Sequence, residues 1–567
     1  MQYQFLESDE LYTSVKTLTN VAKQAAAAVQ KQAKKTEKLI GEIEKPINVP
    51  SLPAGFKVDV PHFDVTKRLN KLPRSWELPQ ELYKKHLPKY NVGTIYRIQE
   101  LLNAGEGYIG QTVTVAGWAR TVRDQKNLCF IELNDGTSFG GIQIVVEDKI
   151  GNFEQVAKTN TGFSLKVTGS IVKSPAKGQL IEMLVADPTK HEVVIIGQAD
   201  PEEYPMAKGV QKPETLRQKA HLRPRGNFFS AVTRIRNNLA YATHVFFQNN
   251  GCLYIHTPII TGSDCEGAGE MFRISTIFDN DVSKIPQING KVDTAQDFFK
   301  KEVNLTVSGQ LQVEHFCISM SNVYTFGPTF RAEKAHTHRH LAEFWMIEPE
   351  FAFADLFDNM EAAEGYVKFC INYILQNNID DLQFLDKRVK PGLIDYLKDI
   401  VSKDFVRCSY TQGIDILLKA QQAGAKFENS DIKWGMDLNS EHERFIAEKV
   451  FQRPVFLYDY PKEIKAFYMK VTDDGKCVRA MDMLIPQVGE LIGGSQREER
   501  YDVLAQRIKE CGLKLEDYGP YMDLRKYGTV PHCGFGLGFE RLVMMVTGVE
   551  NIRDVIPFPR YHGSAEF

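Results

Sequence analysis

The fold is decided by two neighbouring runs in the middle of the chain. They read GPTFRAE over residues 327–333 and THRHLAEF over residues 337–344. Turn-forming and polar residues separate Glu333 from Arg339, which predicts two strands joined by a loop rich in cations. Arg331 on the first strand would offer parallel N–H donors to an anionic oxygen. The alternative is a surface hairpin held by ordinary ion pairs.

A fixed guanidinium suits chemistry at a phosphorus atom, which depends chiefly on charge neutralisation and positioning. On the returning strand, Arg339 and His340 are candidates for further phosphate oxygens, and Phe344 offers a ring face for a purine. The hairpin is therefore a candidate nucleotide site.

Two further clusters lie towards the C-terminus. The run GFGLGFERLVMM at residues 534–545 predicts a glycine-rich strand followed by an apolar helix, with Arg541 in its first turn. The glycines would let the backbone approach a ligand, or would only permit tight packing on a neighbour. The other cluster contains Asp482, Glu490 and Arg497. Carboxylates beside phosphate-binding arginines match the oxygen ligands of Mg²⁺, whereas isolated carboxylates would form surface ion pairs.

Composition narrows the class of protein. The 567 residues suffice for several domains, and a formal net charge of −3 means that any RNA contact must come from local basic patches. The nine cysteines are scattered without a CxxC pair, which favours a reducing compartment. No apolar run approaches the ~20 residues that span a bilayer, and the first residues do not resemble a leader. We expect a cytoplasmic protein with no membrane partner.

Five stretches of the chain differ in composition and hydrophobic pattern. Residues 1–46 are rich in lysine and alanine and predict a helical extension, either a solvated helix or a basic arm on RNA phosphates. Residues 47–93 are proline-rich and indicate an extended linker. Residues 94–200 predict short strands of an oligonucleotide-binding (OB) barrel, and residues 201–225 a hinge. Residues 226–567 lack a βαβ rhythm, which favours a mainly antiparallel sheet flanked by helices. The predicted fold class is multidomain α+β.

The three clusters together resemble the class II aminoacyl-tRNA synthetases. Residues 330–333 (FRAE) are similar to the second signature motif of that class, and residues 536–541 (GLGFER) to the third. A helix expected over residues 228–250 and the following GCLYIHTP at residues 251–258 resemble the first motif, which forms a homodimer interface in that class. The resemblance implies that residues 226–567 form a class II catalytic domain.

The resemblance narrows to one subgroup. Residues 337–341 (THRHL), together with an upstream barrel, are typical of the enzymes for aspartate, asparagine and lysine. Residues 342–350 (AEFWMIEPE) and 493–498 (GGSQRE) resemble the asparaginyl-tRNA synthetases. The resemblance covers about residues 95 to 560. It implies that ATP is a substrate, that Mg²⁺ is a cofactor, that L-asparagine and tRNA(Asn) are joined through asparaginyl-adenylate, and that the chain forms a homodimer.

The resemblance also assigns roles around ATP. Arg331 would stabilise the α-phosphate and Arg541 the γ-phosphate, as the two catalytic residues. Arg339 and His340 would bind the pyrophosphate end, and Phe344 would stack on adenine. Glu333 would contact adenine or the terminal adenosine of tRNA. Mg²⁺ would be held by Glu490 and Asp482. Asp482 is the less secure ligand, because it lies one residue farther from Glu490 than in the aspartate enzymes and because Gly493 replaces their serine.

Further roles concern asparagine and the anticodon. The α-ammonium would meet Glu266 and Gln310, and the side-chain carbonyl would meet Arg497. Glu348 would accept a hydrogen bond from the side-chain amide and would repel an aspartate carboxylate. In the barrel, the anticodon contacts would be Arg123, Phe130 and Gln143. The alternative for Phe130 is a core position beside Ile131 and Leu133.

Three competing functions remain open at this point. The first is an aspartyl-tRNA synthetase that charges one or both tRNAs. The second is a non-catalytic RNA-binding paralogue, which would need none of Arg331, Arg541 and Glu490. The third is an amidotransferring asparagine synthetase on the same catalytic fold, which would need no anticodon barrel.

Overall fold

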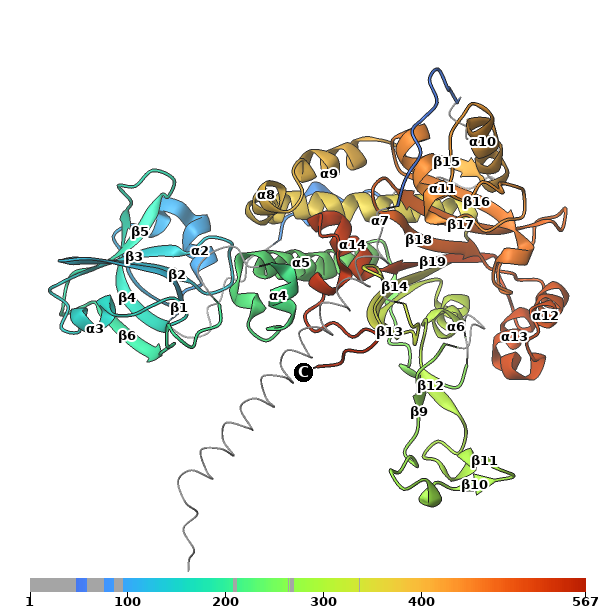
Figure 1. Cartoon of the computed structure of the whole chain (residues 1–567), viewed down its shortest axis with the longest axis horizontal. Coiled ribbons are helices and arrows are strands. Elements are labelled where there is room, and N and C mark those ends of the chain that lie inside the picture. The colour runs from blue at the N-terminus through green and yellow to red at the C-terminus, as the bar shows by residue number, and fades with distance from the viewer. Residues whose placement is uncertain are drawn as a thin grey trace, which may run out of the picture.

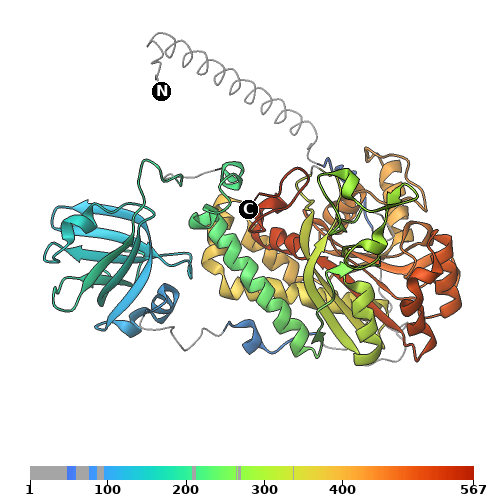
Figure 2. The same cartoon turned by 90° about the horizontal axis from the view of Figure 1, so that it is seen from below.

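The computed structural model describes residues 47–58, 76–85, 95–206, 212–263, 265, 270–335 and 337–566. The predicted lysine-rich extension and Glu266 lie outside these residues. The described chain forms a barrel and a larger α/β body beside it, and the two views in Figures 1 and 2 show the barrel next to α4, α5 and α8. Within the described helices, no segment is long and apolar enough to cross a membrane.

The smaller body is a closed β-barrel. Its strands are β1 (Thr112–Gln125), β2 (Leu128–Asn134), β3 (Ile142–Glu147), β4 (Ser164–Lys173), β5 (Ile181–Val185) and β6 (Glu192–Gly197). They follow the order β1-β2-β3-β5-β4-β6, and β1 also pairs with β4, which closes the barrel. Helix α2 (Ile98–Ala104) precedes the barrel, and α3 (Phe153–Ala157) links β3 to β4. Apolar residues alternate inwards, as the predicted OB barrel requires.

The larger body is built on an eight-stranded sheet. Its order is β15-β16-β17-β18-β19-β14-β13-β7. The strands are β7 (Leu253–Tyr254), β13 (Asn322–Phe330), β14 (Glu343–Ala352), β15 (Val406–Ser409), β16 (Val455–Pro461), β17 (Cys477–Ile485), β18 (Gly489–Gln496) and β19 (His532–Gly538). Only the pairs at the two edges, β7 with β13 and β15 with β16, are parallel. The predicted mainly antiparallel sheet is confirmed.

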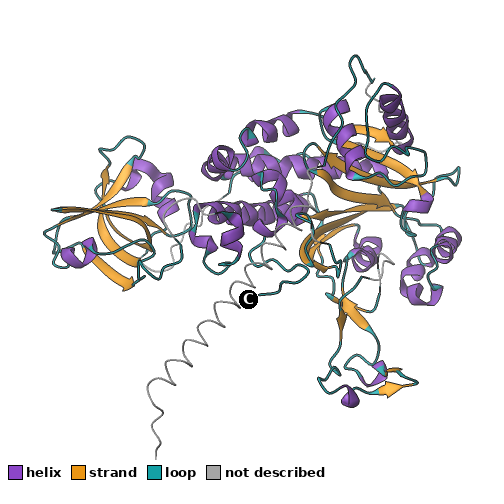
Figure 3. Ribbon diagram, viewed as in Figure 1, coloured by secondary structure: helices purple, strands orange, loops and turns teal. Residues whose placement is uncertain are grey.

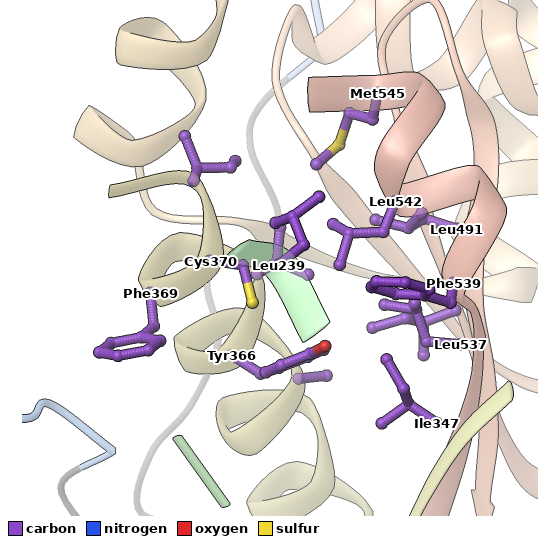
Figure 4. Close-up of a cluster of buried hydrophobic side chains, with 14 of the residues drawn as sticks. Leu239, Ile347, Tyr366, Phe369, Cys370, Leu491, Leu537, Phe539, Leu542 and Met545 are labelled. Atoms are coloured by element: carbon purple, nitrogen blue, oxygen red, sulfur yellow. The ribbon is translucent and has the colours of Figure 1, made fainter. Parts of the chain in front are cut away.

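Three helices cover one face of this sheet, namely α5 (Asn227–Asn249), α7 (Leu356–Asn377) and α14 (Phe539–Thr547). The predicted apolar stripe of α5 is buried, and Figure 4 shows Leu239 close to Tyr366 of α7 and Leu542 of α14, with Leu491 and Leu537 of the sheet beside them. This packing leaves the other face of the central strands for the candidate site.

The remaining elements lie around this core. Helices α8 (Ile379–Arg388) and α9 (Leu393–Ser402) extend the helical layer. Helix α10 (Tyr410–Gln422) packs on β15 and β16, and α11 (Ser440–Arg444) contacts β17 and β18. The other helices are α4 (Pro213–Arg217), α6 (Gln310–Met320), α12 (Tyr501–Glu510) and α13 (Gly519–Lys526). Short strands β8 (Ile260–Thr261), β9 (Arg273–Ile274), β10 (Gln287–Ile288), β11 (Lys291–Val292) and β12 (Val303–Leu305) form a projecting lobe (Figure 3).

The described parts of the proline-rich segment pack against the catalytic body. Trp76 is only 8% exposed, and its ring centroid lies 5.1 Å from that of Phe351. A side chain at Gly365 of α7 would meet Trp76 Cβ at 2.7 Å, so the glycine makes room for the indole. The composition predicted a linker, and it did not reveal that Trp76 belongs to the core.

The predicted hinge is clamped to the C-terminal segment. Arg217 donates two hydrogen bonds to the carboxylate of Asp554, at 2.8 and 2.7 Å. Arg223 is 1% exposed and also reaches Asp554, at 3.4 Å, as well as the carbonyl of Ile556 at 2.6 Å. One carboxylate therefore balances two guanidinium groups, one of them fully enclosed.

A second joint connects the barrel directly to the helical layer. The ring of Phe139, in the loop between β2 and β3, lies 5.0 Å from the ring of Phe384 in α8. Arg234 of α5 donates to the carbonyl of Gly136 in the same loop, at 3.2 Å, and pairs with Asp381 at 2.7 Å. These contacts hold the loop between β2 and β3 of the barrel against the helical layer.

We predict that Asp554→Asn lowers the free energy of unfolding by about 3 kcal/mol, because the enclosed Arg223 loses its counter-charge. Urea denaturation followed by circular dichroism measures the change. Glu214→Gln is the matched control: Glu214 also pairs with Arg217, at 3.7 Å, but is 68% exposed, and we expect a change below about 0.5 kcal/mol. Equal effects of the two substitutions would contradict the clamp.

Candidate active site

The predicted hairpin is present. Strands β13 and β14 pair from Asn322 opposite Phe351 to Phe330 opposite Glu343. Arg331 follows β13 directly, and its backbone N–H donates to the carbonyl of Ala342 at 3.0 Å.

The side chains of the connecting loop gather at this end of the hairpin. The guanidinium of Arg331 stands 5.5 Å from the ring centroid of Phe344. His340 Nε2 is 3.7 Å from Glu333 Oε2, and its Nδ1 is hydrogen bonded to Thr337. The loop between the two strands therefore carries its cations beside an aromatic ring.

Strand β19 passes so close to β14 that side chains would not fit on it. A Cβ at Gly534 would lie 2.3 Å from Glu350 Oε1, and one at Gly536 would lie 2.7 Å from the terminal methyl of Met346. Tight packing therefore explains Gly534, where a Cβ would also meet the backbone carbonyl of Pro349, whereas Gly536 lines the cavity described below. The close approach brings Arg541, in the first turn of α14, to the same end of the sheet as Arg331.

A β-bulge aligns the two carboxylates. Asp482 of β17 pairs with Gly493 of β18, but after the bulge Leu484 pairs with Glu490. The extra residue, Leu491, turns into the core and is 2% exposed. Because of this bulge, Glu490 points to the same side as Asp482.

Gly493 lies beneath both carboxylates. A Cβ at Gly493 would be 3.1 Å from Glu490 Oε1 and 3.5 Å from Asp482 Oδ1. The longer spacing between Asp482 and Glu490 thus leaves the two side chains together.

These side chains surround one cavity of about 270 Å³. Arg331, Asp482 and Glu490 line it, and Arg541 Nη1 lies 3.0 Å from the Glu490 carbonyl oxygen and 3.6 Å from its Oε2. Burial and the Asp482 carboxylate raise the pKa of Glu490, while Arg541, Lys465 and Arg331 oppose that rise. The two arginines and Glu490, distant in sequence, are therefore brought together.

Positive charge is concentrated at one end of the cavity. Burial, together with Arg444 and Arg541, lowers the pKa of Arg339. Burial also lowers the pKa of His340. The neighbouring guanidinium groups of Arg541, Arg331 and Arg339 lower it further, while the Glu333 carboxylate raises it. Crowded cations of this kind are suited to a polyphosphate, whose charge would relieve their mutual repulsion.

The other end of the cavity is lined by the residues predicted to bind an amino acid. Glu348 accepts hydrogen bonds from the Ser308 hydroxyl and, at 2.8 Å, from the backbone N–H of Gly309. Gln310, the first residue of α6, also lines this end.

Arg497 is held by two neighbours at the same end. Its guanidinium forms a two-point contact with Glu350, and its Nη1 donates to Ser495 Oγ at 2.7 Å. The guanidinium is therefore fixed in orientation before any substrate binds.

The predicted anticodon residues lie on the barrel, apart from this cavity. Arg123 of β1 pairs with Phe130 of β2, and its guanidinium is 5.9 Å from the ring of Phe130. Phe130 is partly exposed, whereas Ile131 and Leu133 are fully buried. Gln143 donates to Glu182 at 3.0 Å. Phe130 is thus on the outer surface of the barrel, and its core alternative is wrong.

Comparison with known proteins gives the family. A model described as "tRNA synthetases class II (D, K and N)" matches residues 212–562, and "OB-fold nucleic acid binding domain" matches residues 113–189. The asparagine--tRNA ligase of Protochlamydia amoebophila is 54% identical over 460 residues, covering 81% of this chain and 96% of that relative. That of Acetivibrio thermocellus is 53% identical over 472 residues, covering 83% and 99%. The chain belongs to the asparaginyl class II tRNA synthetases.

Solved structures of this family agree. The asparaginyl-tRNA synthetase of Pyrococcus horikoshii, complexed with asparaginyl-adenylate, is 32% identical with a TM-score of 0.70, covering 83% of this chain and 99% of that one. The corresponding complex from Entamoeba histolytica is 26% identical with a TM-score of 0.66, covering 81% and 97%. The predicted architecture, an OB barrel followed by a class II synthetase domain, is confirmed.

Four residues of this synthetase site were missed from the sequence: Ser308, Glu350, Lys465 and Tyr468. Alternation along β14 would have identified Glu350, which follows Glu348 by two residues and shares its face. Lys465 donates to Asp482 at 2.7 Å but lies in an irregular segment. No spacing rule connects it to the carboxylates.

The residues present fit a Mg²⁺ ion. Two carboxylates face the space above Gly493, and oxygen ligands suit this cation. Across the described ranges, no three His, Cys, Asp or Glu side chains are arranged around one metal position. A Mg²⁺ ion would therefore complete its shell with water and substrate phosphate, as this ion commonly does.

Proposed function

We propose that this chain ligates L-asparagine to tRNA(Asn) at the expense of ATP, through asparaginyl-adenylate. The observation that carries the proposal is the single cavity in which Arg331 and Glu490, with Arg541 beside them, adjoin Gln310, Glu348 and Arg497. The relatives named asparagine--tRNA ligase and the solved adenylate complexes support it. A barrel with a partly exposed aromatic beside an arginine favours this function over an asparagine synthetase.

In the first step, the asparagine carboxylate attacks the α-phosphorus of ATP, and pyrophosphate leaves. Arg331 neutralises charge on the α-phosphate, and Arg541 holds the γ-phosphate. Arg339 and His340 bind the pyrophosphate end. Phe344 stacks on adenine, and Glu333 contacts its amino group or the terminal adenosine of tRNA. No side chain acts as a nucleophile, because positioning and charge neutralisation supply the catalysis.

In the second step, the 3′-hydroxyl of the terminal ribose takes the acyl group and AMP leaves.

Phe130 stacks on an anticodon base, while Gln143 and Arg123 supply a hydrogen bond and a phosphate or base contact. Glu490 and Asp482 would hold Mg²⁺, which would supply charge neutralisation for the phosphates.

Selection of asparagine over aspartate depends on charge. Glu348 is 5% exposed, and its carboxylate is fixed by Ser308 and Gly309. An ionised acceptor there favours a side-chain amide, whereas it would repel a second carboxylate. Arg497 donates to the side-chain carbonyl, and Gln310 and Glu266 receive the α-ammonium.

We further propose that the enzyme is a cytoplasmic homodimer. All nine cysteines are free thiols, which suits a reducing compartment. Several large apolar side chains on α5, α6, β7 and the neighbouring strands are exposed, as expected of a dimer face. They are Tyr241, Leu253, Ile259, Ile260, Phe316 and Met320.

Two substitutions separate activation from RNA recognition. Arg331→Ala should reduce ATP–pyrophosphate exchange with asparagine on the order of 10²–10³-fold, because a charge-neutralising donor is lost, while leaving tRNA affinity near that of the wild type. Arg123→Ala should do the reverse, with normal exchange and roughly tenfold weaker tRNA binding. Filter binding and exchange assays measure both. Near-normal exchange by Arg331→Ala would remove it from the mechanism.

The metal site is tested by Glu490→Gln. We expect the Mg²⁺ concentration for half-maximal exchange to rise at least about tenfold, since one anionic ligand becomes neutral. Glu147→Gln serves as control, because Glu147 on strand β3 of the barrel pairs with Lys149, apart from the cavity, and its Mg²⁺ curve should match the wild type. A Mg²⁺ requirement that is the same in Glu490→Gln as in the wild type would exclude this residue as a ligand.

Glu348→Gln tests the choice of amino acid. The substitution replaces a charged acceptor with an amide that can also donate, so aspartate should be tolerated better. We expect the ratio of kcat/KM for asparagine to that for aspartate, measured by exchange, to fall at least about tenfold. An unchanged ratio would show that discrimination resides elsewhere.

A further inference from the structure

A fully buried carboxylate lies beneath the amino-acid end of the cavity and has no part in the mechanism above. Glu314, in the second turn of α6, is 0% exposed. It accepts hydrogen bonds from the Tyr521 hydroxyl at 2.9 Å, from Arg525 Nη2 at 2.7 Å and from His532 Nε2 at 2.7 Å. Its fourth neighbour is Gln310, whose Nε2 is 3.4 Å from Glu314 Oε2.

These contacts keep Glu314 ionised. Burial alone would raise its pKa, but Arg525, His532 and Arg497 together hold the pKa well below its usual range. An ionised carboxylate accepts hydrogen bonds and cannot donate one. It therefore attracts the NH₂ group of the Gln310 amide and leaves the amide oxygen to face away from it.

Gln310 lines the cavity, so the orientation of its amide matters to a ligand. An α-ammonium group only donates hydrogen bonds, and the amide oxygen of Gln310 only accepts them. A flipped amide would present NH₂ to the ammonium and would repel it. Glu314 thus selects the one orientation that binds a cationic amine.

The same carboxylate is tied to the other amino-acid ligand. The carbonyl of His532 accepts from the backbone N–H of Arg497 at 2.9 Å, and Arg525 Nε donates to the Glu498 carbonyl at 2.9 Å. Through these two partners, Glu314 braces the chain that carries Arg497. Helices α6 and α13 and strand β19 all meet at this one charge.

We propose that Glu314 is a positioning residue for the amino acid: its charge fixes the Gln310 amide with the oxygen towards the cavity, where it accepts a hydrogen bond from the α-ammonium of the substrate. This inference rests on the proposed function of the site. It adds that recognition of the amine depends on a carboxylate that never touches it.

The test compares asparagine with succinamate, which is asparagine without its α-amino group. In Glu314→Gln the amide orientation of Gln310 is no longer defined, so the KM for asparagine in exchange should rise at least about tenfold. The inhibition constant of succinamate should rise much less, by no more than about threefold, because a shift of Arg497 affects both ligands but only asparagine carries the α-ammonium. The KM for ATP should stay within about twofold. Equal losses for asparagine and succinamate, or a matching change for ATP, would show a purely structural role.

Two further variants keep the test decisive. Tyr521→Phe removes one hydroxyl from Glu314 but leaves the charge and the Gln310 contact, so the preference for asparagine over succinamate should persist. Gln310→Met removes the acceptor itself and should lose that preference even if Glu314→Gln does not fold. If Gln310→Met retains the preference, the proposal is wrong.

The proposed function has a separate control. Exchange by the unmodified enzyme must depend on asparagine, and its absence would reject asparagine activation. If aspartate supported exchange instead, the comparison of aspartate with succinate would test the Glu314 proposal independently. Failure of the positioning role and failure of the function therefore give different results.

Discussion

The pairing of β14 with β19 is the constraint on which the rest of the site depends. The two strands are far apart in the sequence, yet Glu350 lies opposite Gly534 at a separation that excludes a side chain there. This contact carries Arg541, which follows β19, to the hairpin that carries Arg331. It also sets Glu350 against Arg497, so the proposed triphosphate and amino-acid ends of the cavity share one strand pair.

The charges of the site are arranged in two zones. Cations dominate where the phosphates would lie, whereas carboxylates hold and orient the groups at the amino-acid end. Lys465 and Glu490 stand between the zones, and the Lys465 pKa is raised despite its burial because Asp482 and Glu490 surround it. A charge-separated cavity of this kind can bind a polyanion and a zwitterion side by side without either disturbing the other.

Local patterns in the sequence were sufficient for the barrel strands, the hairpin and α5, whereas long-range contacts were beyond them. Turn residues between Glu333 and Arg339 predicted the hairpin, and apolar spacing predicted α5. The burial of Trp76 depends on a glycine in a helix far along the chain, which no local pattern reveals. Glu314 likewise resembles any acidic residue of a helix until α13 and β19 enclose it.

Family motifs identify most of the candidate residues that line or adjoin the cavity, and the structure adds the groups that hold them. Such supporting groups are not marked by a local sequence motif, because their partners come from several different helices and strands.

The bulge at Leu491 has a consequence for how ligand pairs are recognised in related chains. The side chain of the extra residue, Leu491, turns into the core, and regular pairing of β17 with β18 continues beyond it. The carboxylates of Asp482 and Glu490 therefore remain adjacent. Separation along the chain is therefore a poor measure of equivalence within a sheet, since a strand can absorb an insertion locally. The cross-strand partner of each carboxylate is therefore the better guide, and an alignment that ignored one inserted residue at this point would shift Glu490 by one position, to the opposite face of the strand.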